Sequence, residues 1–234
     1  MTGRADAGAM GRGPALASMG LAVAAVAIAA GCAAQFTAMP ALFLGHIAAM
    51  CACWCLMTAG SVVYSMAGFW PATGKNKDTA RKAHAAIQST AVLAALVGYL
   101  CIFSNHRLVG GSQFGFDPGN PPAKTAHALL GYVVLALMLL QAVQGWQKFL
   151  GLQVGKIRHL AHPLNGRATL IIAAINMALV LTTFPFLSQA LFLTLAGGIP
   201  VISVLATVLA GPLGKASARE LPDPLEGPGY QVLE

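Results

Sequence analysis

Charged side chains are scarce in this 234-residue sequence, and over long stretches they are missing altogether. Only 9% of the residues are charged, whereas 57% are hydrophobic. No lysine, arginine, aspartate or glutamate occurs in 13–74, 83–106, 125–147 or 168–214. A soluble domain needs a charged surface, so this scarcity excludes one and indicates a membrane protein.

The number of membrane spans follows from the lengths of these uncharged intervals. About 20 apolar residues cross the hydrocarbon core of a bilayer. The two shorter intervals therefore hold one span each. The two longer ones hold two spans each, separated by polar residues and a proline near Pro40 and Pro185. We expect helices at 15–36, 41–68, 80–104, 123–148, 160–184 and 189–212.

Alternating segments of about ten residues, the pattern of a transmembrane β-barrel, are also lacking. An open sheet is excluded too, because its unpaired backbone groups cannot lie in lipid. The sequence therefore predicts an all-α membrane protein with six transmembrane helices.

Positive charge is nearly absent from one side of the predicted helices. Twelve of the fourteen lysines and arginines fall on the side that holds both termini, and only Arg107 and Lys124 fall on the other. By the positive-inside rule, both termini are cytoplasmic. The predicted organisation is a cytoplasmic segment at 1–14, a transmembrane domain at 15–212 and a disordered cytoplasmic tail at 213–234. Topology and anionic lipid account for the net charge of +7, so no nucleic-acid partner is expected.

The five cysteines all lie inside predicted spans, where thiols pack as small hydrophobic groups. At about 100° per helical residue, Cys51 and Cys55 share a face while Cys53 points about 160° away from both. These three thiols cannot bind one metal ion. Cys53 lies on the same face as His46, seven residues earlier, so it is expected beside whatever that histidine binds.

Four histidines occupy equivalent places near the starts of spans two to five. They are His46, His84, His127 and His162. Successive spans run in opposite directions, so His46 and His127 lie at the outer side while His84 and His162 lie at the cytoplasmic side. We call His46 and His127 the outer pair, and His84 and His162 the inner pair.

The spacing of these histidines indicates a repeated hairpin. His46 precedes His127 by 81 residues, and His84 precedes His162 by 78. Spans two and three are therefore expected to repeat as spans four and five about an axis along the membrane normal. Such an axis brings the members of each pair face to face across a central four-helix bundle.

Small or polar residues follow each histidine on its own face. Gln88, Gly131 and Gly166 come four residues after His84, His127 and His162, whereas Met50 holds that place after His46. Fourteen residues after the histidines, in the same order along the chain, come Gly60, Gly98, Gln141 and Asn176. We expect this stripe to make room for a flat group, although small residues also serve helix packing.

A haem held by two axial histidines suits each pair, since it needs two imidazoles from facing helices and a flat slot. Zinc requires four converging ligands, and each side offers only two histidines within the membrane. In the fifth span His159 competes with His162 as the ligand, and we favour His162 because it lies deeper and has a glycine four residues on. Arg167 either pairs with a haem propionate or extends to the membrane surface.

These motifs resemble the cytochrome b561 family of six-helix, two-haem membrane proteins, over about residues 40–182. Similar segments in the branch often fused to DOMON domains match His46 to Trp54, His84 to Gln88, His127 to Gly131 to Gln141, and His162 to Gly166 to Asn176. The chain is too short to hold a DOMON domain as well. The resemblance implies two haem b groups and the pairing of spans two with four and three with five.

The resemblance also implies one-electron transfer across a membrane, from cytosolic ascorbate to monodehydroascorbate or ferric iron outside. Basic residues before the third-span histidine bind ascorbate in such proteins, which points here to Lys77, Arg81 and Lys82, although these residues also suit topology or lipid contact. The segment ending in His106 and Arg107 resembles the outer substrate site, although an exposed loop without a role also explains it. Family members often form homodimers.

Three other functions remain compatible with the same residues. The chain could be a haem-bearing membrane anchor that relays electrons for a separate redox partner. It could use the histidines to transport divalent metal ions. Finally, it could be a structural scaffold in which the histidines only make hydrogen bonds.

Overall fold

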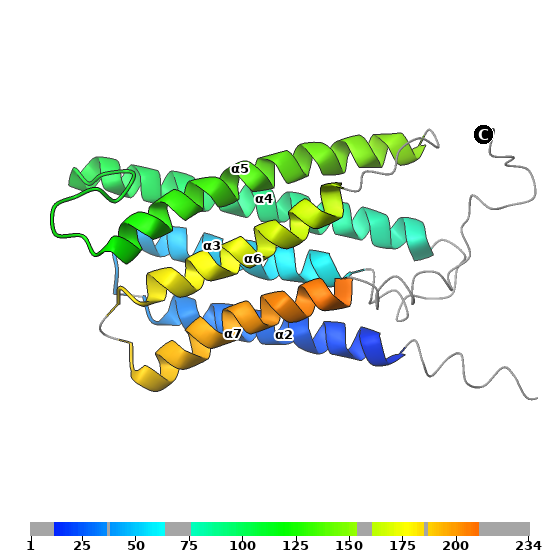
Figure 1. The fold of residues 1–234 in the computed structure, drawn as a ribbon, viewed down its shortest axis with the longest axis horizontal. Coiled ribbons are helices and arrows are strands. Elements are labelled where there is room, and N and C mark those ends of the chain that lie inside the picture. Colours follow the sequence, from blue (N-terminus) through cyan, green and yellow to red (C-terminus); the bar gives the residue numbers. More distant parts are fainter. Residues whose placement is uncertain (1–11, 37, 64–75, 154–160, 185–186, 211–234) are drawn as a thin grey trace, which may run out of the picture.

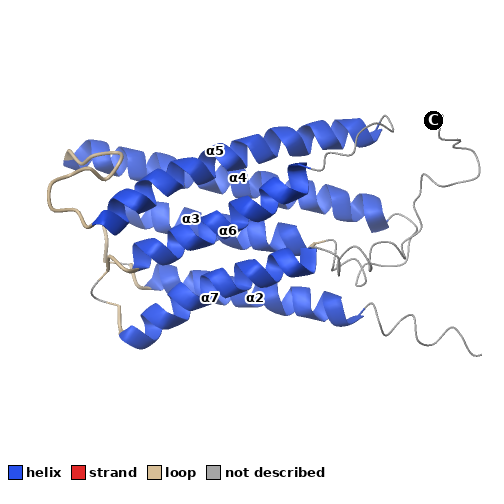
Figure 2. Cartoon of the chain, in the orientation of Figure 1, coloured by secondary structure: helices blue, strands red, loops and turns tan. Residues whose placement is uncertain are grey.

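The computed structural model describes residues 12–36, 38–63, 76–153, 161–184 and 187–210. This part of the chain forms six helices and contains no strand (Figure 2). They are α2 (Arg12–Ala34), α3 (Ala41–Val62), α4 (Asn76–Val109), α5 (Pro122–Gln153), α6 (Ala161–Leu181) and α7 (Gln189–Val208). All six are long and apolar enough to cross a membrane, which confirms the predicted number of spans.

The helices form two facing layers of three. Helices α2, α3 and α4 make one layer, and α7, α6 and α5 make the other (Figure 1). Neighbours in sequence run antiparallel, so α3, α5 and α7 begin at one end of the bundle while α4 and α6 begin at the other (Figure 1). We call these the outer and inner ends, following the side assigned from charge. Helices α3 to α6 form the predicted central four-helix bundle.

Helix α3 ends at Val62, before the predicted end at 68, and 64–68 lie outside the described residues. Two other helices extend furthest beyond their predicted spans. Helix α4 has 34 residues and α5 has 32, so each extends beyond its predicted span at both ends. At about 1.5 Å per residue they are about 50 Å long, whereas the hydrocarbon core is about 30 Å thick. Polar ends can continue as helix through the headgroup region, where charge is tolerated, so the apolar length of a sequence does not set its helix ends.

Helices α2 and α7 pack against α3 and α6 and leave α4 and α5 at the opposite side of the bundle (Figure 1). The most apolar window of α5 has only 6% of its residues buried, compared with 33% for α6. Much of α5 therefore faces lipid. Helix α7 begins after Ser188, whose hydroxyl accepts a hydrogen bond from the Leu191 backbone N–H (3.3 Å).

Candidate functional site: two histidine pairs

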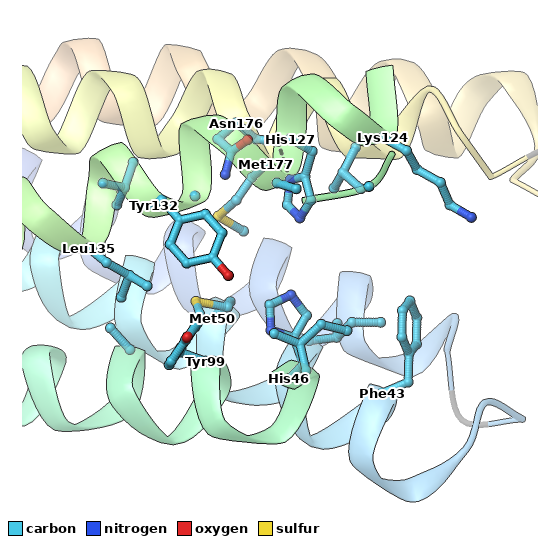
Figure 3. A pocket seen from close by; sticks show the side chains of 18 of the residues that line it. Phe43, His46, Met50, Tyr99, Lys124, His127, Tyr132, Leu135, Asn176 and Met177 are labelled. Atoms are coloured by element: carbon cyan, nitrogen blue, oxygen red, sulfur yellow. Dashed lines mark hydrogen bonds between the residues drawn. The ribbon is translucent and has the colours of Figure 1, made fainter. Parts of the chain in front are cut away.

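The outer pair joins the two layers near the outer end. His46 on α3 and His127 on α5 point toward each other across a cavity, with ring centroids 6.4 Å apart and ring planes at 80° (Figure 3). The cavity has a volume of about 440 Å³, within the range of sites for small ligands. Its walls beside the histidines include the apolar side chains of Phe43, Met50 and Met177.

The inner pair repeats this arrangement at the other end. His84 on α4 and His162 on α6 have ring centroids 6.3 Å apart and ring planes at 83°. The structure thus brings together both pairs of histidines that the sequence predicts to face each other. No group of three or more histidine, cysteine, aspartate or glutamate side chains suited to a metal ion occurs among the described residues.

Three of the four imidazoles are oriented by backbone carbonyl groups. The Nδ1 atoms of His46, His84 and His127 lie 2.9 Å from Gly98 O, 2.7 Å from Gly60 O and 3.3 Å from Asn176 O. A carbonyl oxygen can only accept, so each Nδ1 carries the proton and donates it. The Nε2 atom then keeps its lone pair, as a histidine that binds a metal requires.

The match with a known family covers this same part of the chain. Residues 45–190 match the family model of the eukaryotic cytochrome b561. The chain belongs to the cytochrome b561 family. Comparisons with curated proteins and with solved structures gave no match. Family membership, with the six candidate spans, makes this chain an integral, multi-pass membrane protein of a family that transfers electrons across membranes and binds haem b.

Both pairs have the separation that a shared metal ion requires. A metal–imidazole bond of about 2 Å on each side, with about 1 Å from each nitrogen to its ring centre, gives centroids about 6 Å apart. The observed 6.4 Å and 6.3 Å agree with this value. Asn176 Oδ1, in the wall of the outer cavity, is buried without a hydrogen-bond partner. The outer pair and its cavity therefore fit a bis-histidine haem, and the inner pair has a matching separation.

The residues fourteen positions after the histidines have a role that the sequence did not reveal. Gly98 and Gly60 each lie opposite the histidine of the neighbouring helix and present their carbonyl groups to it. The equal offset was the signal that could have disclosed this. Each of two antiparallel helices has a histidine near its start. The residue of one helix that lies level with the histidine of the other therefore follows its own histidine by the same number of positions in both helices.

His162 is held differently from the other three. Gln141 Nε2 donates to the His162 backbone carbonyl (2.9 Å) and lies 3.5 Å from His162 Nε2. The Gln141 carbonyl oxygen accepts in turn from Asn165 Nδ2 (3.1 Å). A side-chain amide network thus contacts the His162 backbone and its Nε2 atom, whereas backbone carbonyls contact Nδ1 in the other three histidines.

A structured loop closes the outer end of the cavity. Asp117 Oδ1 accepts from Ser112 N (2.8 Å), and Thr125 Oγ1 donates to Gly115 O (2.8 Å). Gly115 has φ +72° and lies so close to the Thr125 backbone that a Cβ atom would meet Thr125 Cα at 3.1 Å, which explains the glycine there. Loop residues that line the cavity are Gly111, Ser112, Gln113, Gly115, Asp117 and Asn120.

Aromatic side chains bridge α4 and α5 beside this loop. The Tyr99 and Tyr132 ring centroids are 5.9 Å apart, and Phe114 of the loop packs on Tyr132 at 5.3 Å. Both tyrosines lie in the cavity wall, one helical turn deeper than the outer pair (Figure 3).

The residues predicted to bind substrates are divided between the outer and inner ends of the bundle. His106 lines the outer cavity, and its Nδ1 atom is buried without a hydrogen-bond partner, whereas Arg107 is exposed and lies outside the cavity wall. Half-buried Arg81 and exposed Lys82 lie near the start of α4, at the inner end. The Lys77 side chain and all of His159 fall outside the described residues.

Arg167 and the cysteines contribute to packing between helices. Arg167 Nη2 lies 3.4 Å from Ala210 O, beyond the end of α7. Cys53 Sγ lies 3.9 Å from Met138 Sδ in the cavity wall, and Cys55 Sγ donates to Ala25 O (3.3 Å). The predicted proximity of Cys53 to the site of His46 thus agrees with the structure.

Proposed function

We propose that this protein transfers single electrons from a cytosolic reductant, ascorbate, to an acceptor on the other side of the membrane, through two haem b groups held by the outer and inner pairs. The acceptor is monodehydroascorbate or ferric iron. The observation that carries the proposal is the recurrence of one histidine geometry at both ends of the bundle, at 6.4 Å and 6.3 Å.

The chemistry supplied by bound haem is reversible one-electron exchange at iron. The chain supplies four imidazoles, with Nδ1 protonated in at least His46, His84 and His127, and the cavity that encloses the outer pair has largely apolar walls. Along α3, His46 and Gly60, which faces His84, are separated by 14 residues, or about 21 Å. This separation supports a scheme with one pair near each membrane face, in which no substrate needs to enter the hydrocarbon core.

The two mouths suit different partners. At the inner end, Arg81 and Lys82, together with Lys77, provide positive charge for the acidic enediol of ascorbate. At the outer end, His106 borders the cavity beside the outer pair and is our candidate for contact with the acceptor, while Arg107 is placed to act only from the surface. Arg167 remains a candidate partner for a propionate of the inner haem. A homodimer in the lipid bilayer is compatible with this scheme.

The decisive experiment is the haem content of the purified chain by pyridine haemochrome. We expect two haems per chain and reduction by ascorbate within seconds. A metal transporter or a scaffold would show no Soret absorbance. A membrane anchor for a separate redox partner would contain haem but would react with ascorbate only when that partner was added.

The two mouths can be tested separately. Replacing Arg81 and Lys82 by glutamine should slow reduction by ascorbate and leave reoxidation by ferric chelate unchanged. His106→Ala should do the opposite, with Arg107→Gln as the matched control outside the cavity wall. Equal effects of His106→Ala and Arg107→Gln would contradict a specific outer role for His106.

A further inference from the structure

Helix α7 carries no histidine, yet it reaches the cavity between the two layers. Ile199 lines the cavity, and Ser203, one helical turn further on, is fully buried. The indole N–H of Trp54 on α3 donates to Ser203 Oγ at 2.9 Å. The Ser203 hydroxyl donates its own proton to Ile199 O at 2.9 Å. With that proton engaged, a lone pair of the oxygen faces the indole and fixes its orientation.

Trp54 lies at a level between the two histidine pairs. On α3 it follows His46 by eight residues, or about 12 Å, and precedes Gly60 by six, or about 9 Å. It is 1% exposed, is the largest fully buried side chain of the described residues, and lines the cavity together with Met57 and Met138. The other buried side chains at this level of α4 and α6 include Ala91, Ala95, Leu170 and Ala174, none of which has a π system.

We propose that Trp54 is the group through which the electron passes between the inner and outer haem sites, and that Ser203 of α7 is the residue that positions it. This inference rests on the proposed two-haem function. One electron leaves the inner site and one arrives at the outer site. The indole stays neutral, no proton moves and no bond forms or breaks, so the step requires no further reactant.

A tryptophan that only fills space would also need a partner for its buried indole N–H, so the bond to Ser203 serves packing as well as orientation. Burial without a partner for the indole N–H would be unfavourable by about 1–3 kcal/mol, so the bond to Ser203 also stabilises the contact between α3 and α7. The test must therefore separate electron transfer from stability.

The experiment uses the full-length protein with bound haem in liposomes, reduced rapidly from the cytoplasmic side. The measured quantity is the rate at which the electron equilibrates between the two haems, followed by absorbance. We expect Trp54→Leu to lower this rate several-fold and Trp54→Phe, which keeps an aromatic ring, to lower it less. Trp146→Leu is the matched control, because Trp146 is 63% exposed on α5 and should leave the rate unchanged.

Ser203 is tested by a second, independent measurement. In haem-free protein with Trp70 and Trp146 replaced by phenylalanine, Ser203→Ala should shift the emission of Trp54 to shorter wavelength, because the indole loses its acceptor. Ser203→Thr, which keeps the hydroxyl, should restore the wild-type emission. In the haem-loaded protein, Ser203→Ala should slow equilibration and Ser203→Thr should recover it, with both midpoint potentials unchanged.

The outcomes distinguish this inference from the proposed function. Suppose that the Trp54→Leu and Trp54→Phe variants bind two haems with unchanged midpoint potentials, and that the electron equilibrates between these haems as fast as in Trp146→Leu. The role of Trp54 is then overturned, while the proposed function stands. If Ser203→Ala changes neither emission nor rate, the role of Ser203 is overturned. If the wild-type chain binds fewer than two haems, the proposed function itself fails.

Discussion

In the hairpin of α3 and α4 the fourth residue after each histidine is large and the fourteenth is glycine, whereas in the hairpin of α5 and α6 the order is reversed. Each glycine faces the larger side chain of the neighbouring helix. The facing residues are Gly98 and Met50, Gly60 and Gln88, Gly131 and Asn176, and Gly166 and Gln141. A pair of helices thus needs one glycine opposite one long side chain at each level, on either helix.

The reversal changes how the histidines are held. Glycine carbonyl groups in α3 and α4 come within 2.9 Å and 2.7 Å of the neighbouring Nδ1 atoms. The corresponding carbonyl of Asn176 is 3.3 Å from His127 Nδ1, and at His162 the Gln141 side chain donates to the backbone carbonyl and lies 3.5 Å from Nε2. A glycine has no Cβ atom, so its carbonyl group can approach the neighbouring imidazole more closely than that of Asn176 does. The first hairpin therefore orients its ligands by backbone, and the second partly by amide side chains.

The largest effect should come from removing one histidine of either hairpin. We expect His127→Ala to abolish the outer haem site and His84→Ala to abolish the inner one, so that each variant retains about one haem per chain. Pyridine haemochrome with redox titration measures this, and the titration shows which potential is lost. His106→Ala, which lines the outer cavity without belonging to a pair, should retain both haems. Loss of both haems from each variant would mean that the two sites do not form independently.

Replacing a glycine by alanine should destabilise the protein more where the glycine lies tightly against the neighbouring helix, as at Gly60, than where the contact is loose, as at Gly131. A Cβ atom at Gly60 would lie 2.6 Å from Gln88 Nε2 and 2.8 Å from its Cδ, so the whole side chain must move. We expect Gly60→Ala to destabilise the protein by about 1–3 kcal/mol. At Gly131 the nearest atom is Asn176 Nδ2 at 3.7 Å, an ordinary contact, so Gly131→Ala should change stability by less than about 0.5 kcal/mol.

Thermal unfolding in detergent compares the two alanine variants directly. The double variant Gly60→Ala with Gln88→Ala should recover part of the stability that Gly60→Ala loses, because the clash is relieved. Equal destabilisation by Gly60→Ala and Gly131→Ala would contradict the tighter contact at Gly60.

Replacing the amide side chains Gln141 and Gln88 should have the smallest of these effects, and the cost in stability should differ between the two. Gln141 binds the His162 carbonyl and Asn165, so we expect Gln141→Leu to cost about 1–3 kcal/mol and to broaden the electron paramagnetic resonance signal of the inner haem. Gln88 makes one long bond, to Met57 O at 3.4 Å, so Gln88→Leu should cost about 1 kcal/mol or less. A larger loss from Gln88→Leu than from Gln141→Leu would show that the amide network does not support His162.

Much of the fold could be predicted because lipid makes hydrophobic length a direct signal. The number of helices, their approximate places and the membership of the central bundle all follow from uncharged intervals and from four histidines at equivalent places. The limits of α4 and α5 could not be predicted, since a helix stabilised by its own backbone hydrogen bonds continues through the headgroup region after the apolar residues end.

The candidate site was predictable to the level of facing residues. His46 opposite His127 and His84 opposite His162 follow from antiparallel spans that each begin with a histidine. The stripe fourteen residues later was interpreted as room for a flat group, whereas in the structure it supplies carbonyl oxygens and close helix contacts. Periodicity identifies a shared face, but it does not say which atom on that face meets the neighbouring helix.

By itself, the sequence determined that this chain crosses a membrane six times and carries two couples of histidines at opposite ends, because both properties depend only on distance along the chain. The tertiary structure alone decided which backbone carbonyls hold the imidazoles, that Arg167 reaches Ala210, and that Trp54 is anchored on α7. These contacts join residues 24 to 149 positions apart, and they depend on how each helix is rotated and tilted against its neighbours. Side-chain volumes at every crossing set that rotation together, so no single segment of sequence contains it.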